Sequence, residues 1–330
     1  MKRNFIIFFS AILAVILFEV FLRYSPFSYG RSPVEYDSII GMWHKKQYSN
    51  YIINTCYKTL YSFDKNGLPK NVHNYDKNKQ DVVLLGDSFI EALMVKNEKI
   101  IHNSLSKEYN HKYNFMNYAL SGTSPTQQFI ILKKKVNLSN TKYITQFIFL
   151  ESDLMDVDSK NLDYFTRPKV FVEFDSLDKY KIISPRDATI YDKISDVMGN
   201  FELYTYIKKS LYYLRNKIEG LNQISTKKQI SYRQEQKLDL TMNWMYLKGA
   251  IYQINTIANE HNITYTPIII STNPENINIM KDFFQQYNIR YLVLQNEIDF
   301  ILETFPCDGH WLDKTHINIA KYLKNIGFYE

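Results

Sequence analysis

The hydrophobic and polar positions divide the chain into an apolar amino-terminal run, a mixed stretch, and a long region where short apolar runs alternate with amphipathic segments. Continuous apolar runs suit parallel strands buried on both faces, and apolar positions three or four apart indicate helices. Strands are predicted at 82–86, 113–118, 143–150, 263–270 and 290–294. Helices are predicted near 89–108, 125–136, 240–261, 275–287 and 314–325. This alternation is typical of an α/β domain with a parallel sheet, which we expect over 81–330.

The alternation fails between about 155 and 238, which indicates an insertion or cap. Within it, 170–174 and 180–183 predict a hairpin, and 201–218 predicts an aromatic-rich helix. Inserted segments at the carboxyl ends of sheet strands often border a ligand site. The insertion therefore either sets substrate choice or shields a sheet edge, and the sequence leaves both roles open.

The amino-terminal run predicts a membrane anchor. Lys2 and Arg3 precede 5–22, which only Ser10 and Glu19 interrupt. About eighteen helical residues rise about 27 Å, close to the hydrocarbon thickness of a bilayer. Because no short apolar core with a small-residue cleavage site is present, an uncleaved anchor over 1–23 is favoured over a cleaved signal peptide. The basic residues predict a cytoplasmic amino terminus and an exported remainder.

Composition narrows the remaining classes of function. Residues 24–80 hold scattered Pro and Gly, and we expect a loop-rich or short-stranded segment that packs on the main domain. The chain has 330 residues, of which 45% are hydrophobic, enough for a well-buried core. Its 40 basic and 34 acidic residues give a formal net charge of +6, spread without a compact basic block, so nucleic-acid binding is not expected.

Two cysteines, Cys56 and Cys307, are either a disulfide pair, which export would permit, or two buried thiols. No CxxC pair or His/Cys cluster indicates a metal site, and no cofactor is predicted.

The first predicted strand of the main domain ends in Gly86-Asp87-Ser88, at the turn into an amphipathic segment. Gly86 permits a tight turn, and a hydroxyl at a helix start faces free N–H groups that favour negative charge. These properties suit a nucleophile. The same tripeptide is also an ordinary turn followed by a helix N-cap, so the motif alone leaves both readings open.

A second group of reactive residues lies near the carboxyl terminus. Asp308 and His310 stand two apart, and in an extended loop both would point to one side, so that the carboxylate could orient the imidazole. His316 is a rival base, but its place before an apolar helical stripe favours packing or capping. The remaining histidines lack a nearby acid and glycine-bearing turn, and we expect them to be structural.

The Gly86-Asp87-Ser88 turn and the late Asp308-x-His310 resemble the SGNH (GDSL-type) hydrolase superfamily. The resemblance implies a three-layer αβα domain with a flavodoxin-like sheet. It implies that Ser88 is the nucleophile and that Asp308 and His310 complete a catalytic triad. The family's acid commonly stands three residues before the histidine. The shorter spacing, with Trp311 following, resembles membrane-anchored bacterial relatives that modify polysaccharides.

The same resemblance implies an oxyanion hole. Its second block matches 117–122, with Gly122 at the position whose N–H joins that of Ser88. In the third block Ser152 stands where the family has asparagine. A serine hydroxyl can donate but is shorter and rotates freely, and losing one such donor typically lowers turnover about 10²–10³-fold.

These inferences predict an exported, anchored serine esterase or O-acyltransferase acting on acyl groups, acetyl in the first instance, of cell-envelope or secreted glycans. Its partners would be the membrane, through the amino-terminal helix, and the acylated glycan. A catalytically weakened glycan-binding or assembly protein is the alternative, supported by Ser152. An unrelated α/β protein with a chance Gly-Asp-Ser is a third reading.

Overall fold

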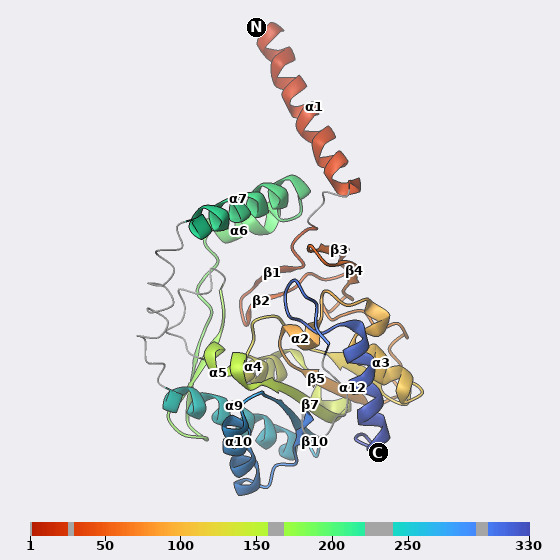
Figure 1. Cartoon of the computed structure of the whole chain (residues 1–330), viewed down its shortest axis with the longest axis vertical. Helices are drawn as coiled ribbons and strands as arrows, with labels where there is room; N and C mark the ends of the chain where they lie inside the picture. The colour runs from red at the N-terminus through yellow and green to blue at the C-terminus, as the bar shows by residue number, and fades with distance from the viewer. Residues whose placement is uncertain (1, 26–29, 158–167, 222–239, 295–302) are drawn as a thin grey trace.

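The computed structural model describes residues 2–25, 30–157, 168–221, 240–294 and 303–330. Figure 1 shows a layered α/β body with one long helix, α1 (Lys2–Tyr24), projecting from it. The carboxyl terminus lies in the body, far from the amino terminus.

The body is organised around a five-stranded parallel sheet. Its strands are β5 (Asp81–Leu85), β6 (Asn114–Asn117), β7 (Thr141–Phe149), β10 (Thr264–Ile270) and β11 (Leu292–Val293). The order across the sheet is β11-β10-β7-β5-β6, with every pairing parallel. Numbered along the chain this is 2-1-3-4-5, the flavodoxin-like order. The five predicted strands and the fold class are confirmed.

Helices cover both faces of this sheet, which makes three layers. Successive residues of β5 enter opposite cores, Val83 and Leu85 one and Val82 and Leu84 the other. The first core takes most of its helical residues from α4 (Pro125–Lys135), α9 (Leu240–Glu260) and α10 (Pro274–Gln286). The second takes them from α2 (Ser88–Glu91), α3 (Ile101–Glu108) and α12 (Asp313–Asn325).

The single helix predicted over 89–108 is wrong. Helix α2 ends at Glu91, Ala92 adopts a left-handed conformation with φ 54°, and a 3₁₀ turn at Asn97–Lys99 precedes α3. The helix ends because side chains from other elements bind its last carbonyl groups. Asn117 Nδ2 donates to the carbonyl of Ile90 at 2.8 Å and the Tyr61 hydroxyl donates to the carbonyl of Glu91 at 2.8 Å, so both take the place of the next helical turn.

Residues 30–80 contain two antiparallel hairpins. They are β1 (Val34–Asp37) with β2 (Gly41–His44), and β3 (Ser49–Ile53) with β4 (Lys58–Ser62). Buried side chains of this segment join both cores of the sheet domain, Trp43 on one side and Tyr61 on the other. The segment therefore contributes to the packing around the sheet.

The insertion holds the predicted hairpin, β8 (Phe171–Phe174) with β9 (Tyr180–Ile183), and a longer helix than predicted, α7 (Glu202–Leu221). Two further helices were not predicted, α5 (Leu150–Asp156) and α6 (Ile190–Met198). Phe174 packs so closely on α9 that a Cβ at Gly249 would lie 2.4 Å from its ring. The hairpin thus covers the helical layer, since the edge strands of the sheet are β6 and β11.

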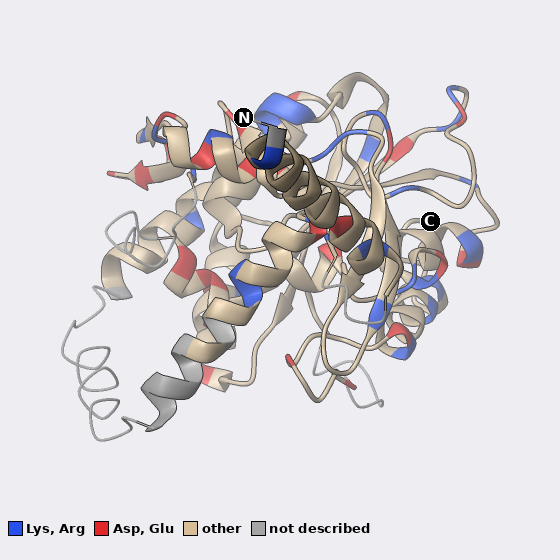
Figure 2. Cartoon of the chain, turned by 90° about the horizontal axis from the view of Figure 1, so that it is seen from above, with Lys and Arg blue, Asp and Glu red and all other residues tan. Residues whose placement is uncertain are grey.

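Helix α1 is long and apolar enough to cross a membrane over Arg3–Tyr24. Its side chains from Phe5 to Val20 are largely exposed, and Figure 2 shows a helix with almost no charge between its ends.

Candidate active site

Ser88 lies at the carboxyl end of the central strand β5, where it is the first residue of α2. The Asp87 carboxylate caps the helix by accepting the Phe89 N–H at 3.0 Å. Gly86 is required by space, since a Cβ there would lie 2.6 Å from the Ile90 side chain. The first N–H groups of a helix have no intrahelical partner, so the Ser88 amide is suited to receive negative charge.

His310 meets Ser88 although 222 residues separate them in the chain. The distance from His310 Nε2 to Ser88 Oγ is 2.8 Å, within hydrogen-bonding range. The distance from His310 Nδ1 to Asp308 Oδ1 is 3.5 Å, slightly longer than a hydrogen bond. The three residues that the sequence singled out as nucleophile, base and orienting acid therefore lie in one row.

The loop of Asp308 and His310 is turned rather than extended, which corrects the sequence-based geometry. Gly309 has φ +78°, and its N–H donates to the carbonyl of Phe305 at 2.9 Å. Asp308 Oδ1 accepts the main-chain N–H of His310 at 3.1 Å. The carboxylate thus fixes the loop as well as facing the imidazole.

The β3–β4 hairpin is joined to the loop of Asp308 and His310. Cys56, in the hairpin turn, forms a disulfide with Cys307, the residue before Asp308. Burial, followed by the interaction of its hydroxyl with the Asp308 carboxylate, raises the pKa of Tyr57 to about 12. The cysteine pairing that the sequence left open therefore joins the amino-terminal segment to the last block of the chain.

Aromatic rings surround the imidazole. The Phe89 ring lies 4.9 Å from that of His310 and stacks on Phe149 at 4.2 Å. The buried Trp311 contacts both phenylalanine rings. This apolar wall limits water around the Ser88–His310 pair on one side.

The loop that carries Gly122 is held against the Ser88 turn. The Leu120 N–H donates to the carbonyl of Gly86 at 3.2 Å, and the Thr123 hydroxyl donates to the same oxygen at 3.1 Å. Gly122 itself has φ +71°, a conformation that favours glycine. The second block therefore lies beside the first.

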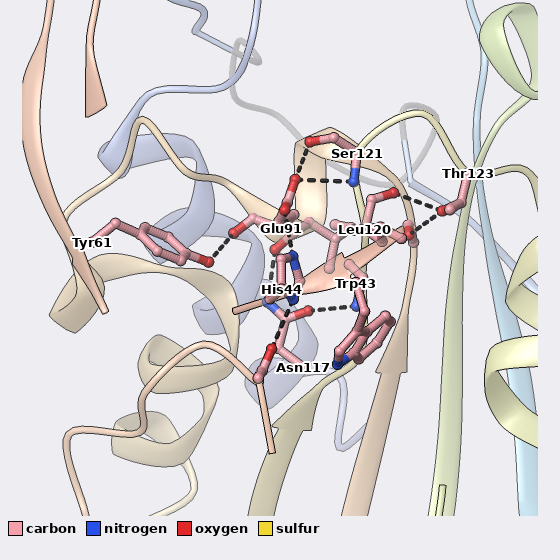
Figure 3. Close-up of polar contacts among 12 residues, drawn as sticks. Trp43, His44, Tyr61, Glu91, Asn117, Leu120, Ser121 and Thr123 are labelled. Carbon is pink, nitrogen blue, oxygen red and sulfur yellow. Dashed lines mark hydrogen bonds and ion pairs between the residues drawn. The ribbon is translucent and has the colours of Figure 1, made fainter. Parts of the chain in front are cut away.

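A buried polar network that the sequence reading missed locks this loop to α2 (Figure 3). Glu91 and His44 are fully buried, and Glu91 Oε1 lies 2.5 Å from His44 Nε2. The other carboxylate oxygen accepts the main-chain N–H of Ser121 at 3.0 Å and also its hydroxyl. His44 Nδ1 contacts the carbonyl of Gly67 at 2.8 Å. The available signal was a glutamate one helical turn after Ser88, but its partners lie far away in the chain.

Two buried carboxyl groups, one of them in the Ser88 turn itself, lie close together. Burial, reinforced by the charges of Asp156 and Glu91, raises the pKa of Asp87 to about 7. Burial and the charges of Asp87 and Asp156 raise the pKa of Asp153 well above its usual range. Asp153 Oδ2 accepts the Phe149 N–H at 2.9 Å, which fixes the end of β7.

Ser152 lies in α5, immediately after β7. Its hydroxyl donates to the carbonyl of Phe149 at 3.2 Å. Within the described residues it has no hydrogen bond to Ser88, Gly122 or His310. The hydroxyl would have to leave Phe149 in order to serve an oxyanion.

His316 is fully buried, and burial lowers its pKa to about 3. Its ring packs at 5.7 Å from Trp311. This buried position agrees with the packing role favoured from the sequence. The imidazole that contacts Ser88 is that of His310, not that of His316.

A cavity of about 150 Å³ adjoins the second-block loop. Its lining includes Gly122, Leu120 and Leu93, and its far wall comes from the amino-terminal segment through Val34 and Met42. The lining is mainly apolar but also includes Glu91 and Ser121, and it contains neither Ser88 nor His310.

No protein-family model and no curated protein sequence matches this chain. Three solved structures are similar to it: a proposed acylhydrolase from Bacteroides fragilis NCTC 9343, a two-domain esterase active on acetylated mannans, and a lipase from a goat rumen metagenome. Identities are 11%, 8% and 9%, and TM-scores are 0.37, 0.38 and 0.36. The matches cover 77%, 76% and 76% of this chain, and 89%, 49% and 98% of the other chains. Every TM-score is below 0.5, so these similarities are weak.

Proposed function

We propose that this protein is a membrane-anchored serine ester hydrolase or O-acyltransferase of the SGNH type. The observation that carries the proposal is the 2.8 Å contact between Ser88 Oγ and His310 Nε2, with Asp308 on the other side of the ring. A hydroxyl, an imidazole and a carboxylate in this order are the parts of a general-base-activated nucleophile.

In the proposed reaction, Ser88 Oγ attacks the acyl carbonyl while His310 Nε2 takes its proton. Asp308 stabilises the imidazolium that results. His310 then gives the proton to the leaving alcohol oxygen, which leaves an acyl group on Ser88. Water or a sugar hydroxyl then attacks the acyl group while His310 takes the acceptor's proton, and His310 returns that proton to Ser88 Oγ as the acyl–serine bond breaks. The product is an acid when water is the acceptor and a new ester when a sugar hydroxyl is. The two outcomes differ only in the acceptor.

The carbonyl oxygen would gain its negative charge between the Ser88 and Gly122 N–H groups, with Ser152 as a third donor if its hydroxyl turns from Phe149. The Asp308–His310 distance of 3.5 Å needs to shorten by about 0.5 Å to become a hydrogen bond, a change common when substrate binds.

The proposed substrate class rests on the resemblance and on the expected location of the protein. We propose a short acyl group such as acetyl from the resemblance alone, because the apolar cavity beside Gly122 is lined by neither Ser88 nor His310. A helix suited to span a bilayer and a disulfide both favour an exported location, where acylated glycans of the envelope are among the accessible esters. We propose that the amino terminus is cytoplasmic and that the catalytic domain lies outside.

One observation favours a second candidate, a binding or assembly protein with weakened catalysis. The Ser152 hydroxyl is engaged by the Phe149 carbonyl, so one predicted oxyanion donor is turned to another acceptor. This candidate predicts glycan binding without ester turnover.

Hydrolysis of 4-nitrophenyl acetate by the full chain in detergent distinguishes the two candidates. We expect turnover that Ser88→Ala and His310→Ala each reduce by about 10³-fold or more, because either change removes the activated nucleophile. Ser139→Ala, at an exposed serine, is the matched control and should retain full activity. Equal turnover in wild type and Ser88→Ala would refute the nucleophile assignment.

A further inference from the structure

Helix α6 presents its charged side to the protein and its apolar side to the exterior. Asp192 is buried and pairs with Arg186, and Asp196 Oδ2 accepts the main-chain N–H of Tyr36 at 3.1 Å. On the opposite face Ile190, Ile194 and Val197 are 77%, 53% and 62% exposed. In water the reverse orientation is the stable one, so this face needs an apolar neighbour.

Helix α7 continues that apolar surface. Phe201, just before it, and Ile207, Leu211 and Leu214 within it are exposed. The last three recur at helical spacing and form one stripe. Together with the three exposed α6 residues they make the surface that we call the α6–α7 face.

Glu19 of α1 fixes where the α6–α7 face lies along the axis of the anchor helix. Its carboxylate caps α7 by accepting the N–H groups of Glu202 at 3.0 Å and Leu203 at 2.9 Å. Arg23 donates to Glu19 at 2.7 Å and to the carbonyl of Asn200 at 3.3 Å. Because Glu19 is one turn from the end of α1, the start of α7 lies where the apolar span ends.

The arrangement in Figure 1 agrees with a position of α6 and α7 at the end of the apolar span of α1. Helices α6 and α7 lie crosswise to α1 on the side of the body from which α1 projects, whereas α9 and α10 lie at the opposite end. A cavity of about 670 Å³ separates α1 from the pair, and its lining includes Val15, Met198 and Ile207. A space bounded by a spanning helix and by apolar side chains has the size and chemistry to accept lipid acyl chains.

We propose that the α6–α7 face lies in the interface of the bilayer that α1 spans, as a flat platform that holds the body against the membrane. The occupant is lipid because the face continues directly from the anchor. The exposed Lys193 and Lys208 provide positive charge for anionic headgroups. This inference rests on the anchoring role of α1 in the proposed function.

The consequence is a fixed orientation of the body. One helix alone would allow the domain to tilt. A platform joined to β1 through Tyr36, and to Lys45, the residue after β2, which donates to Asn200 at 2.8 Å, adds a second attachment. The face that lies on the bilayer would then be the same in every molecule.

Depth-dependent fluorescence of the full chain tests this proposal. The native cysteines form a disulfide, so single cysteines introduced by Ile194→Cys and Leu211→Cys can carry an NBD fluorophore. The labelled proteins are reconstituted in vesicles of phosphatidylcholine and phosphatidylglycerol, with or without a doxyl quencher on the acyl chains near the headgroups. We expect blue-shifted emission at both positions and loss of most of it with the quencher.

Two further labels separate failure of the platform from failure of the anchor. Leu13→Cys, at the middle of α1, reports on the anchor with a second lipid that carries its doxyl group near the end of the acyl chain, and Glu275→Cys on α10 is the matched aqueous control, expected to be unquenched by either lipid. Quenching at 13 without quenching at 194 and 211 overturns the platform and leaves the anchor. No quenching at 13, 194 or 211 overturns both. Blue-shifted emission at 194 and 211 that the lipid quencher leaves unchanged means that protein covers the face and also overturns the proposal. Unchanged thermal unfolding of each labelled protein confirms that it is folded.

Discussion

At the scale of single residues, the site depends on Glu91, a buried side chain that has no hydrogen bond to Ser88 or His310 among the described residues. Glu91 links three parts of the chain: α2 after Ser88, the loop before Gly122, and His44 of the amino-terminal segment. Its carboxylate accepts the Ser121 N–H, so the amide that follows, that of Gly122, is oriented indirectly. Glu91 is a positioning residue in this account.

Glu91→Gln should lower kcat for 4-nitrophenyl acetate by about 10–100-fold and leave KM nearly unchanged, because a misaligned oxyanion donor acts on the transition state. Glu98→Gln, at an exposed position in the same segment, should have no effect. A change in KM alone, or a kcat loss that merely parallels lower thermal stability, would contradict the positioning role.

Asp87 gives the protein a characteristic pH dependence of stability. Its pKa rises from 3.8 to about 7 on folding, so the folded state holds the proton more tightly. Stability contributed by the protonated form is therefore present at low pH and is lost as pH rises from about 4 through 7.

Urea unfolding from pH 5 to pH 8 should show most of this loss, at most about 3 kcal/mol, since unfolding releases the proton between pH 5 and the folded pKa of about 7. Asp87→Asn keeps the cap on Phe89 but cannot ionise, so its stability should change less over the same range. Equal pH slopes in the two proteins would show that Asp87 does not titrate in this range.

At the scale of elements, the β3–β4 hairpin and the last loop form one unit through Cys56–Cys307 and the Tyr57–Asp308 contact. Sequence alone could not establish this unit, because its halves are 251 residues apart. The break after α2 was hidden for a similar reason, since Tyr61 and Asn117 come from other elements. Helix α6 was missed although its apolar spacing was visible. Its orientation could not be predicted, because it depends on the contact of Asp196 with Tyr36, 160 residues away.

Removal of the disulfide by Cys56→Ser with Cys307→Ser should lower the free energy of unfolding by about 2–5 kcal/mol and reduce kcat, because the loop of Asp308 and His310 loses its support. Dithiothreitol should reproduce both effects in wild type and change nothing in the double variant. Full activity and stability in the double variant would show that Tyr57 and the main-chain contacts suffice.

At the scale of the whole molecule, the apolar runs predicted the parallel strands, whereas the layers, the strand order and the pairing of Ser88 with His310 were implied by the resemblance to the SGNH superfamily. Parallel strands place their carboxyl ends at one edge, and continuous apolar runs mark those strands clearly. The polar network around Glu91 and the orientation of α6 did not follow, because each depends on which distant side chain a buried group meets.

The central claim is that Ser88 is an activated nucleophile. The most direct test is labelling of the full chain with a fluorophosphonate, followed by mass spectrometry of the peptides. The account predicts one adduct, on Ser88, strongly reduced in His310→Ala and abolished in Ser88→Ala. An adduct of equal yield in wild type and Ser88→Ala, or no adduct on the folded wild type, would contradict it.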